Sequence, residues 1–356
     1  MNTAQLLEKL AESHRLQSSE WEALIAGQTP ELAEEAARLA RLAREPFYGK
    51  KVFIRGLIEF TNFCRNDCLY CGIRRSNRNA ARYRLTREQI LSCCEIGWEL
   101  GFRTFVLQGG EDPWFTDEKI CELAREIKSR WPQCAVTLSI GEKEETSYRA
   151  FREAGADRYL LRHETADTDH YQRLHPPELT LEHRMNCLRT LKRLGFQTGA
   201  GFMVGSPGQT PQTLAKDMLF LQELQPEMVG IGPFLPHHDT PFAKEPAGNG
   251  EQTLYLLSLV RLMMPQVLLP ATTALGTLLP NGRERGMLAG ANVVMPNLSP
   301  GDVRDKYLLY DNKLHSGDEA AESVRHLRAS MAAIGYEVVT DRGDCAAVCK
   351  DGRETT

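Results

Sequence analysis

The chain has 356 residues, 42% of them hydrophobic, which is enough to bury the core of one large domain. Its formal net charge of −4 excludes the basic field that attracts nucleic acid, and no apolar run approaches the roughly 20 residues that span a bilayer. The first nine residues lack the layout of a secretory signal, and ten mostly scattered cysteines are typical of a reducing compartment. We therefore expect a cytoplasmic protein without a nucleic-acid or membrane partner.

The first 48 residues are predicted to form helices that cap a larger domain. Ser18-Ser-Glu-Trp21 has the pattern of a capping box, and Thr29-Pro30 begins a run rich in alanine, leucine and arginine. The following segment, Lys51 to Phe60, is β-branched and apolar. It is the first predicted strand.

Predicted strands and helices then alternate up to about residue 295. Seven more strands are predicted at residues 104–107, 135–140, 158–161, 197–204, 228–231, 267–270 and 291–295. Helices are predicted at residues 86–100, 116–130, 144–154, 180–194, 210–224, 252–264, 284–288 and 318–334. Apolar strands that alternate with helices favour an α/β fold with parallel strands, most simply a closed (β/α)8 TIM-type barrel; a six-stranded partial barrel is the alternative.

The predicted division of the chain has three parts. A helical cap covers residues 1–48, the barrel covers residues 49–310, and a C-terminal helix and tail cover residues 311–356. The last stretch, residues 341–356, is rich in glycine and aspartate, and we expect it to be loop-like and mobile.

Three cysteines in one short loop follow the first predicted strand. Cys64, Cys68 and Cys71 have the spacing C-x3-C-x2-C. A structural zinc ion requires four closed ligands, but no other Cys or His lies within ten residues on either side. A [4Fe-4S] cluster held by three thiolates keeps one iron without a protein ligand, as a catalytic cluster requires. These three cysteines are therefore the predicted metal ligands and catalytic centre.

Polar residues also follow other predicted strands, at the end where an α/β barrel carries its chemistry. Gln108 and the paired glycines Gly109-Gly110 come after the second strand, where glycine allows the backbone to approach a ligand. Arg162 and Glu164 alternate to one side at the end of the fourth strand, so that they could bind the charged groups of one ligand. His163, between them, is expected to point outward as a structural residue.

The later strand ends add further candidates. Arg184 lies on the helix after the fourth strand, and Met203 lies in the glycine-rich fifth strand, where it could contact an adenine. The pair His237-His238 suggests a metal, but no third ligand follows at a fitting spacing. Thr272 and Thr273 place two hydroxyls at the end of the seventh strand, which suits a small polar or anionic ligand.

The cysteine loop resembles the signature of the radical S-adenosylmethionine (SAM) superfamily, and Tyr70 and Gly72 match it as well. Longer strings resemble the HydE family, the radical SAM maturases of the [FeFe]-hydrogenase active-site cluster. They extend from about residue 50 to residue 310 and include Phe53-Ile-Arg55-Gly, Val106-Leu-Gln-Gly-Gly-Glu-Asp-Pro113, Arg162-His-Glu-Thr-Ala166 and Pro270-Ala-Thr-Thr-Ala274.

The resemblance implies a [4Fe-4S] cluster and SAM as cofactors, and a 5′-deoxyadenosyl radical that acts on a cysteine-bound iron carbonyl cyanide complex. It implies that the cofactors contact Tyr70, Gln108, Gly109, Arg162, Glu164, Arg184 and Met203. It implies that the substrate contacts Arg55, Thr137, Thr272 and Thr273. The implied partners are other maturases, of the HydG and HydF types, and an electron donor such as ferredoxin or flavodoxin.

Two alternatives remain open at this stage. The chain could be another enzyme of the same neighbourhood, such as a biotin synthase or a methylornithine synthase, or an iron-sulfur scaffold that hands over a cluster and needs no SAM site. One departure also matters. Some relatives bind a second cluster through C-terminal cysteines, whereas here Cys345 and Cys349 supply at most half a site. We therefore predict one cluster, and a chain that ends after Gly343 is expected to keep SAM cleavage.

Overall fold

Parallel strands that are buried on both faces form the centre of the structure. The computed structural model describes residues 1–313 and 320–349. Six strands form one parallel sheet, in the order β2 (Gly56–Thr61), β3 (Thr104–Gly109), β4 (Ala135–Ser139), β5 (Arg158–Leu160), β6 (Gln197–Ala200) and β8 (Met228–Val229). Their β-branched and aromatic residues suit such doubly covered strands.

Further pairings close this sheet into a barrel. Single parallel bridges join Met228 to Leu268 and Pro270 to Val293, so residues 267–270 take the place of the seventh strand. β10 (Val293–Val294) pairs with β1 (Lys51–Ile54), which leads directly into β2. The predicted eight-stranded α/β barrel is therefore confirmed, and its first strand bends at Arg55. β7 (Met203–Val204) and β9 (Gly232–Pro233) form a short parallel pair just beyond β6 and β8.

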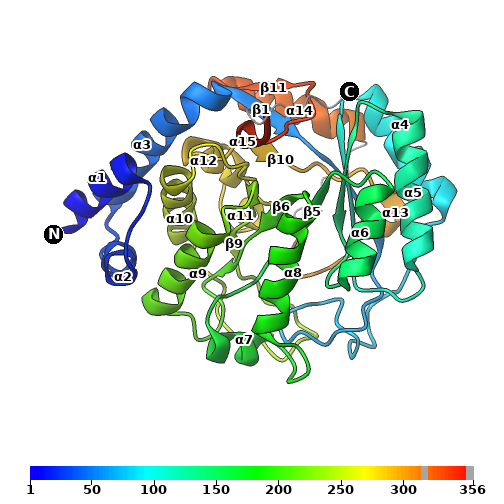
Figure 1. Cartoon of the computed structure of the whole chain (residues 1–356), viewed down its shortest axis with the longest axis horizontal. Helices are drawn as coiled ribbons and strands as arrows, with labels where there is room; N and C mark the ends of the chain where they lie inside the picture. The colour runs from blue at the N-terminus through cyan, green and yellow to red at the C-terminus, as the bar shows by residue number, and fades with distance from the viewer. Residues whose placement is uncertain (314–319, 350–356) are drawn as a thin grey trace.

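A layer of helices surrounds the strands (Figure 1). The layer contains α4 (Arg87–Glu99), α5 (Asp117–Arg130), α6 (Glu145–Glu153), α8 (Leu181–Arg193), α9 (Pro211–Leu224), α10 (Gly250–Met263) and α12 (Gly282–Leu288). Thr86, Thr116, Thr180 and Thr210 are N-cap residues, and each side chain accepts a backbone N–H of the first turn. These caps explain why the predicted starts of four helices lie within one residue of the observed ones.

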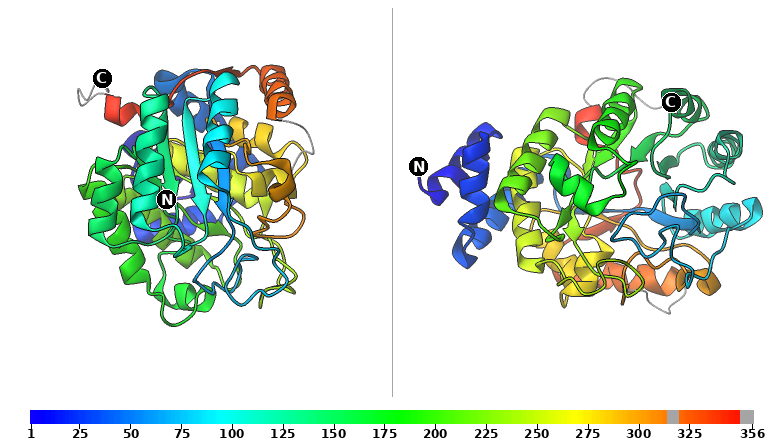
Figure 2. Two further views of the ribbon diagram at one scale, coloured as in Figure 1. Left: turned by 90° about the vertical axis from the view of Figure 1, so that its right-hand side faces the viewer. Right: turned by 90° about the horizontal axis from the view of Figure 1, so that it is seen from below.

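The N-terminal helices cover one flank of the barrel. α1 (Thr3–Ser13), α2 (Ser18–Ala26) and α3 (Pro30–Tyr48) pack beside α9 and α10, and Figure 2 shows them at one edge of the molecule. Arg44 anchors α3, because its buried guanidinium donates to the carbonyls of Ala291 at 2.5 Å and Lys51 at 2.7 Å. The predicted cap therefore lies against the outside of the barrel and not across the carboxyl ends of its strands.

The C-terminal part returns to the end of the barrel where the strands begin, opposite their carboxyl ends. α14 (Ala320–Ala333) is followed by β11 (Glu337–Val339), which pairs with β1, and by α15 (Ala346–Cys349). The prediction of a mobile tail is wrong for residues 341–345, because Gly343 and Cys345 are buried. The reason is that polar groups of this segment bind partners inside the barrel, which sequence cannot show. Residues 350–356 and the Cys349 side chain lie outside the described part.

Three short helices complete the described elements: α7 (Thr168–Leu174), α11 (Thr273–Leu278) and α13 (Gly301–Arg304). α7 follows β5 on the side where the loops gather at the lower edge of Figure 1, and α11 follows residues 267–270. Within residues 1–313 and 320–349, no helix combines the length and the apolar composition that a membrane crossing needs.

Candidate active site

The cysteine loop leaves β2 at the carboxyl end of the barrel, and one arginine holds its backbone. Arg82 donates hydrogen bonds to carbonyl oxygens of Asn62 (2.5 Å), Ile73 (2.8 Å), Arg74 (2.6 Å) and Asn77 (3.0 Å). Because these carbonyls lie on both sides of the three cysteines, a single guanidinium ties the two halves of the loop together. The sequence analysis missed Arg82, which lies eleven residues beyond the last cysteine.

Two glycines allow other segments to lie directly against this loop. A Cβ atom at Gly110 would lie 2.2 Å from the carbonyl oxygen of Phe63, and one at Gly72 would lie 2.2 Å from that of Leu308. Neither position can therefore carry a side chain without displacing backbone. The sequence analysis expected the backbone at Gly109-Gly110 to approach a ligand. At Gly110 it approaches the backbone of the cysteine loop instead.

The three thiols suit a cluster better than a single ion. A tetrahedral zinc with bonds of about 2.3 Å to sulfur holds its sulfurs about 3.8 Å apart. Within the described residues, the only trio of metal-type donors that lies within 4.8 Å of one another is His237, His238 and Asp239, so the cysteine sulfurs are spread more widely. Burial raises the pKa of each cysteine, to about 12 for Cys71, so metal binding must release protons. Spacing of this kind fits the larger [4Fe-4S] cubane.

An internal cavity of about 280 Å³ adjoins the cysteine loop. It is lined by Tyr70 and Cys71 of the loop and by side chains from the carboxyl ends of the strands. The predicted residues that line it are Tyr70, Gln108, Gly109, Arg162, Glu164, Arg184 and Met203. The fold therefore brings these seven residues, which are up to 133 positions apart in sequence (203 − 70), around one space.

Arg162 and Glu164 lie at the end of β5 in an unusual backbone. Glu164 has a φ of 66°, and its peptide is fixed by hydrogen bonds to Gly201 at 3.1 Å and from Met203 at 3.3 Å. The guanidinium of Arg162 lies 3.0 Å from the carboxylate of Glu164 without the alignment of a hydrogen bond. Arg162 Nε and Nη2 and Glu164 Oε2 are buried and have no hydrogen-bond partner within the described chain. Left-handed backbone and unsatisfied polar atoms together are typical of a ligand site.

Arg184 is buried and also faces the cavity. Its Nε atom contacts the carboxylate of Glu142, and its Nη1 atom donates to the carbonyl of Arg162 at 2.8 Å. A helical arginine is usually solvated, so its burial beside a cavity indicates a role in binding or in positioning. Glu142 is the second member of this pair, and the sequence analysis missed it.

Tyr70 is oriented by a neutral histidine. The carbonyl of Tyr171 lies 2.9 Å from His175 Nδ1, and a carbonyl can only accept, so Nδ1 carries the proton. His175 Nε2 then accepts from the hydroxyl of Tyr70 at 3.3 Å. Burial, followed by the positive charge of Arg184, lowers the pKa of His175 to about 3. The ring is therefore neutral and holds the Tyr70 side chain at the cavity wall.

The four predicted substrate residues lie outside the lining of this cavity. Arg55 and Thr137 line a void of about 10 Å³ deeper in the barrel, and Leu160 lies between the two spaces. Thr273 lines a separate pocket of about 170 Å³, whereas Thr272 caps α11 by accepting the N–H of Leu275. The structure thus divides the predicted substrate region into three places.

Residues of a segment after β10 complete the cavity and were not predicted. Tyr307 and Tyr310 line it, as do Ser139 and Phe234. Lys313 holds this segment over the barrel, because its ammonium donates to the buried carboxylate of Glu59 at 2.5 Å and to the carbonyl of Tyr307 at 2.9 Å. The two tyrosines in Tyr307-Leu-Leu-Tyr310 were a signal in the sequence, but nothing local placed them at the cavity.

The histidines of the strand ends are structural. His163 is buried against Phe202 and Phe220, as expected. The statement that His237 and His238 lack a third donor is wrong, since Asp239 lies within 4.8 Å. However, Asp239 N–H donates to His237 Nδ1 at 3.1 Å, so the neutral ring carries its proton on Nε2 and has no free lone pair for a metal.

Comparisons with known proteins give independent evidence of the family. Residues 58–221 match the model of the family described as the Radical SAM superfamily. The chain is 49% identical over 281 residues to the [FeFe] hydrogenase maturase subunit HydE of Thermotoga maritima, which covers 79% of this chain and 80% of that protein. It is 28% identical to the 3-methylornithine synthase of Methanosarcina acetivorans over 89% of each chain.

Solved structures show the same fold. A crystal structure of methylornithine synthase superposes with a TM-score of 0.82 and 26% identity over 97% of this chain and 99% of that chain. A crystal structure of HydG, a maturase of the [FeFe]-hydrogenase, has a TM-score of 0.79 at 19% identity, with 94% of this chain and 75% of that chain covered. The second likeness concerns the fold alone.

Proposed function

This chain belongs to the HydE family of the radical SAM superfamily, and from that premise we propose that it acts on a small iron complex during maturation of the [FeFe] hydrogenase. It is a radical SAM enzyme with a [4Fe-4S] cluster and SAM as cofactors. When bound, these cofactors supply a 5′-deoxyadenosyl radical by reductive cleavage of SAM. The observation that carries the proposal is the position of the cysteine loop directly beside a cavity lined by unsatisfied charged groups.

In this proposal the chain holds the cofactors with residues from five different segments. Cys64, Cys68 and Cys71 bind the cluster, and their spread-out sulfurs support that role. Arg162 and Glu164 bind the charged groups of SAM, because they carry buried polar atoms that lack a partner. The other contacts are assigned to Tyr70, Gln108, Gly109, Arg184 and Met203, all of which line the cavity.

The remaining residues shape the cavity and give it apolar walls. Tyr307, Tyr310 and Phe234 form an aromatic wall of the cavity. Burial raises the pKa of Tyr307 and of Tyr310, so both hydroxyls stay protonated and act only as neutral hydrogen-bond partners. Apolar walls of this kind help to keep water away from a reactive intermediate once the ligands fill the space. Arg55 and Thr137, deeper in the barrel, and Thr272 and Thr273, at the end of the seventh strand, are proposed as substrate contacts. Contact with Arg55 and Thr137 requires the spaces separated by Leu160 to join when substrate enters.

The proposed substrate is the cysteine-bound iron carbonyl cyanide complex, whose sulfur the radical attacks. HydG-type and HydF-type maturases are proposed as the proteins before and after this step, and ferredoxin or flavodoxin as the electron donor. The relative from Thermotoga maritima supports this placement. The catalytic part is proposed to be residues 49–310, with residues 1–48 and 311–356 as additions to it.

One experiment tests the function directly. The protein is reconstituted anaerobically, reduced in the presence of SAM and assayed for 5′-deoxyadenosine with and without the iron complex. We expect cleavage by the wild type and none by Cys68→Ala. A protein that holds a cluster but never forms 5′-deoxyadenosine would be a scaffold, and the proposal would then be wrong.

A second candidate activity is that of a methylornithine synthase, since the solved structure of that enzyme superposes over 97% of this chain. The same assay with lysine, and with dethiobiotin for a biotin synthase-like activity, separates these reactions. We expect substrate-dependent consumption only with the iron complex. Conversion of lysine would replace the proposed substrate but would leave the radical SAM assignment intact.

A further inference from the structure

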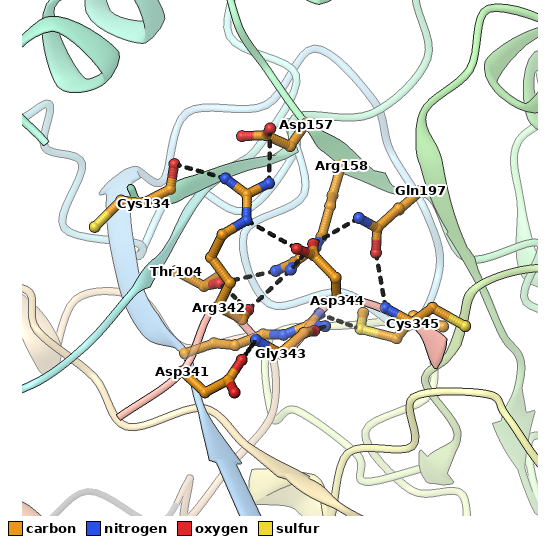
Figure 3. A network of polar contacts seen from close by, with 12 residues as sticks. Thr104, Cys134, Asp157, Arg158, Gln197, Asp341, Arg342, Gly343, Asp344 and Cys345 are labelled. Atoms are coloured by element: carbon orange, nitrogen blue, oxygen red, sulfur yellow. Dashed lines mark hydrogen bonds and ion pairs between the residues drawn. The ribbon is translucent and has the colours of Figure 1, made fainter. Parts of the chain in front are cut away.

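A short segment closes the end of the barrel that lies opposite the cysteine loop. We call residues 341–345 the floor strap. Figure 3 shows it beneath the first residues of three strands, Thr104 of β3, Arg158 of β5 and Gln197 of β6. The carbonyl oxygen of Arg342 accepts hydrogen bonds from Thr104 Oγ1 at 2.8 Å and Arg158 Nη2 at 2.9 Å. The strap is thus fixed to the barrel through its backbone.

The carboxylate of Asp344 is the centre of this contact. It accepts from Arg158 Nη2 at 2.6 Å, from Gln197 Nε2 at 2.6 Å and from Arg342 Nε at 2.8 Å. Burial alone would raise the pKa of Asp344, but Arg158 and Arg342 outweigh it and hold the pKa well below its ordinary value. Asp344 is therefore ionised, with donors on both of its oxygens.

Two buried arginines meet above the strap. Arg55 and Arg158 are 1% and 2% exposed, and the like charge of Arg158 adds to the effect of burial in lowering the pKa of Arg55. Asp344 opposes that effect. Two other carboxylates near this pair are already bound. Glu227 accepts from Lys192 at 2.6 Å and from the N–H of Thr198 at 2.7 Å, and Asp157 accepts from Arg342 at 3.0 Å and from the N–H of Val136 at 2.8 Å. Asp344 is consequently the anion on which this pair of guanidiniums depends.

No free anion has room beside the pair while the strap is in place. The void that Arg55, Thr137 and Arg158 line has a volume of about 10 Å³, which is at most the space of one water molecule. Arg55 Nε, Thr137 Oγ1 and Arg158 Nε, which are buried, have no hydrogen-bond partner in the described chain. Asp344 thus supplies the carboxylate for Arg158 Nη2 and Gln197 Nε2, while the three unused donors line a void too small for a second anion.

We propose that the floor strap is an internal ligand: the Asp344 carboxylate occupies an anion-binding site on Arg158 and Gln197 and thereby seals the end of the barrel opposite the cysteine loop. The ligand class of this site is a small carboxylate. Asp344 is a positioning residue, because it acts on Arg55 and Arg158 and touches neither the cysteine loop nor the upper cavity. The proposal goes beyond the proposed function and holds whichever substrate enters from above.

The test replaces the tethered carboxylate by a free one. Thermal unfolding of the reconstituted Asp344→Ala protein is followed during a titration with formate at constant ionic strength. We expect a Tm about 5 °C below that of the wild type, because one partner of a buried ion pair is missing. Formate should recover a large part of this loss in a saturable way, since it binds the folded state only.

The matched control is Asp341→Asn, which removes one negative charge from the same strap. Asp341 is exposed and accepts only the N–H of Gly343, at 2.7 Å, and the amide oxygen of asparagine can keep that bond. The control and the wild type should show no formate response beyond that of chloride. A formate response in Asp344→Ala equal to that of the wild type would overturn the proposal.

If Asp344→Ala does not fold, the isosteric Asp344→Asn provides the test. Combined with Arg158→Met, it should add little to the loss caused by Arg158→Met alone, because both changes remove the same contact. Additive losses would contradict the proposal.

A second measurement tests the seal. Cys345 is 2% exposed, and its N–H donates to Gln197 Oε1 at 3.1 Å. A maleimide, mapped by peptide mass spectrometry, should modify Cys345 in Asp344→Ala at least tenfold faster than in the wild type, and formate should restore protection. Equal rates would show that Asp344 does not hold the floor closed.

Discussion

The Nη1 atom of Arg184 donates a hydrogen bond of 2.8 Å to the backbone carbonyl of Arg162, so a residue of α8 supports the end of β5. Through its Nε atom the same guanidinium contacts Glu142, which follows β4. Arg184 therefore connects two neighbouring strand ends and the helix that covers them. A shift of α8 would move the groups that we assign to SAM, which makes Arg184 a support for the site as well as part of its wall.

The first prediction concerns the stability of this pair. Arg184→Gln should destabilise the protein by about 3–5 kcal/mol, because the Glu142 carboxylate, 4% exposed, would remain buried without its cation. Urea-induced unfolding measures the change. The double variant Glu142→Gln/Arg184→Gln should recover most of the loss, since two neutral amides can bond with each other. If the double variant is less stable than either single variant, the pair is not the reason for the effect.

The second prediction concerns Glu164. Glu164→Gln should weaken SAM binding about 10- to 100-fold, because one charge-assisted contact of roughly 1.4–2.8 kcal/mol is lost. Cluster absorbance should stay unchanged, since no cysteine is affected. Calorimetry of the reconstituted protein measures the SAM affinity of the wild type and of the variant. The control is Glu35→Gln, which changes an exposed carboxylate of α3.

A particular pair of results would reject that assignment. If Glu164→Gln and Arg162→Gln both bind SAM with wild-type affinity, neither residue contacts it. The contact would then move to Arg184, the remaining charged residue of the predicted set that lines the cavity.

The third prediction concerns the cysteine loop. Cys68→Ala should abolish cluster absorbance and SAM cleavage, because two thiolates cannot hold a catalytic four-iron cluster. Cys121→Ala is the control, since Cys121 is buried in α5 on the outer layer and should be dispensable. Electron paramagnetic resonance gives the readout. A SAM-responsive cluster signal that persists in Cys68→Ala would remove this cysteine from the ligand set.

Local sequence was sufficient for the barrel and for much of the cavity wall. Alternating apolar strands and threonine caps predict the elements, and the strand ends predict the side of the chemistry, so Arg162 and Glu164 were found from their spacing alone. The left-handed backbone of Glu164 was not predictable, because it depends on hydrogen bonds to residues 201–203.

Residues that act through long-range contacts were missed for the same physical reason. Tyr307 reaches the cavity only because Lys313 binds Glu59, a residue 254 positions earlier. Asp344 is polar and glycine-flanked, so its local sequence indicates a loop, whereas its partner Arg158 lies 186 positions away. Such pairs are invisible to periodicity, which reports only what neighbouring residues share.

The fourth prediction concerns acid stability. His175 has a pKa of about 3 in the folded protein and 6.5 when unfolded, so below about pH 6.5 only the unfolded state takes up the proton. Stability should therefore fall with pH between 6.5 and 3, by up to about 1.4 kcal/mol per pH unit from this residue. In the His175→Gln variant, this contribution to the change of stability with pH should disappear. Urea unfolding at pH 7, 6 and 5 measures the difference.

His238 provides a control of opposite sign. His238 Nδ1 donates a hydrogen bond to the carboxylate of Asp311, which raises the pKa of this exposed histidine. Its contribution to stability is therefore present below pH 6.5 and is lost as the pH rises through the folded value. His238→Gln should therefore lose more stability at pH 5 than at pH 8. If the stability of both variants changes with pH in the same way, burial of His175 is not the cause of the loss of stability in acid.

The last prediction concerns the C-terminal end of the chain. We expect the protein to bind one cluster, and we expect its stability to require the floor strap but not residues 350–356. Cys345 lies at the end of the barrel opposite the cysteine loop, where its thiol contacts the carbonyl of Gln266 at 3.1 Å. Within the described residues it belongs to no group of three metal-type donors. Reconstitution should give about four irons per chain in the wild type and in Cys345→Ser/Cys349→Ser. A chain ending at residue 349 should keep its Tm, whereas one ending at residue 343 should lose several degrees, because it lacks Asp344 and the buried Cys345. The sequence-based expectation that a chain ending after Gly343 keeps SAM cleavage stays a prediction, and the structure adds that such a chain should be less stable. An iron content of about eight in the wild type that falls to about four in the double variant would show a second cluster and would contradict the prediction.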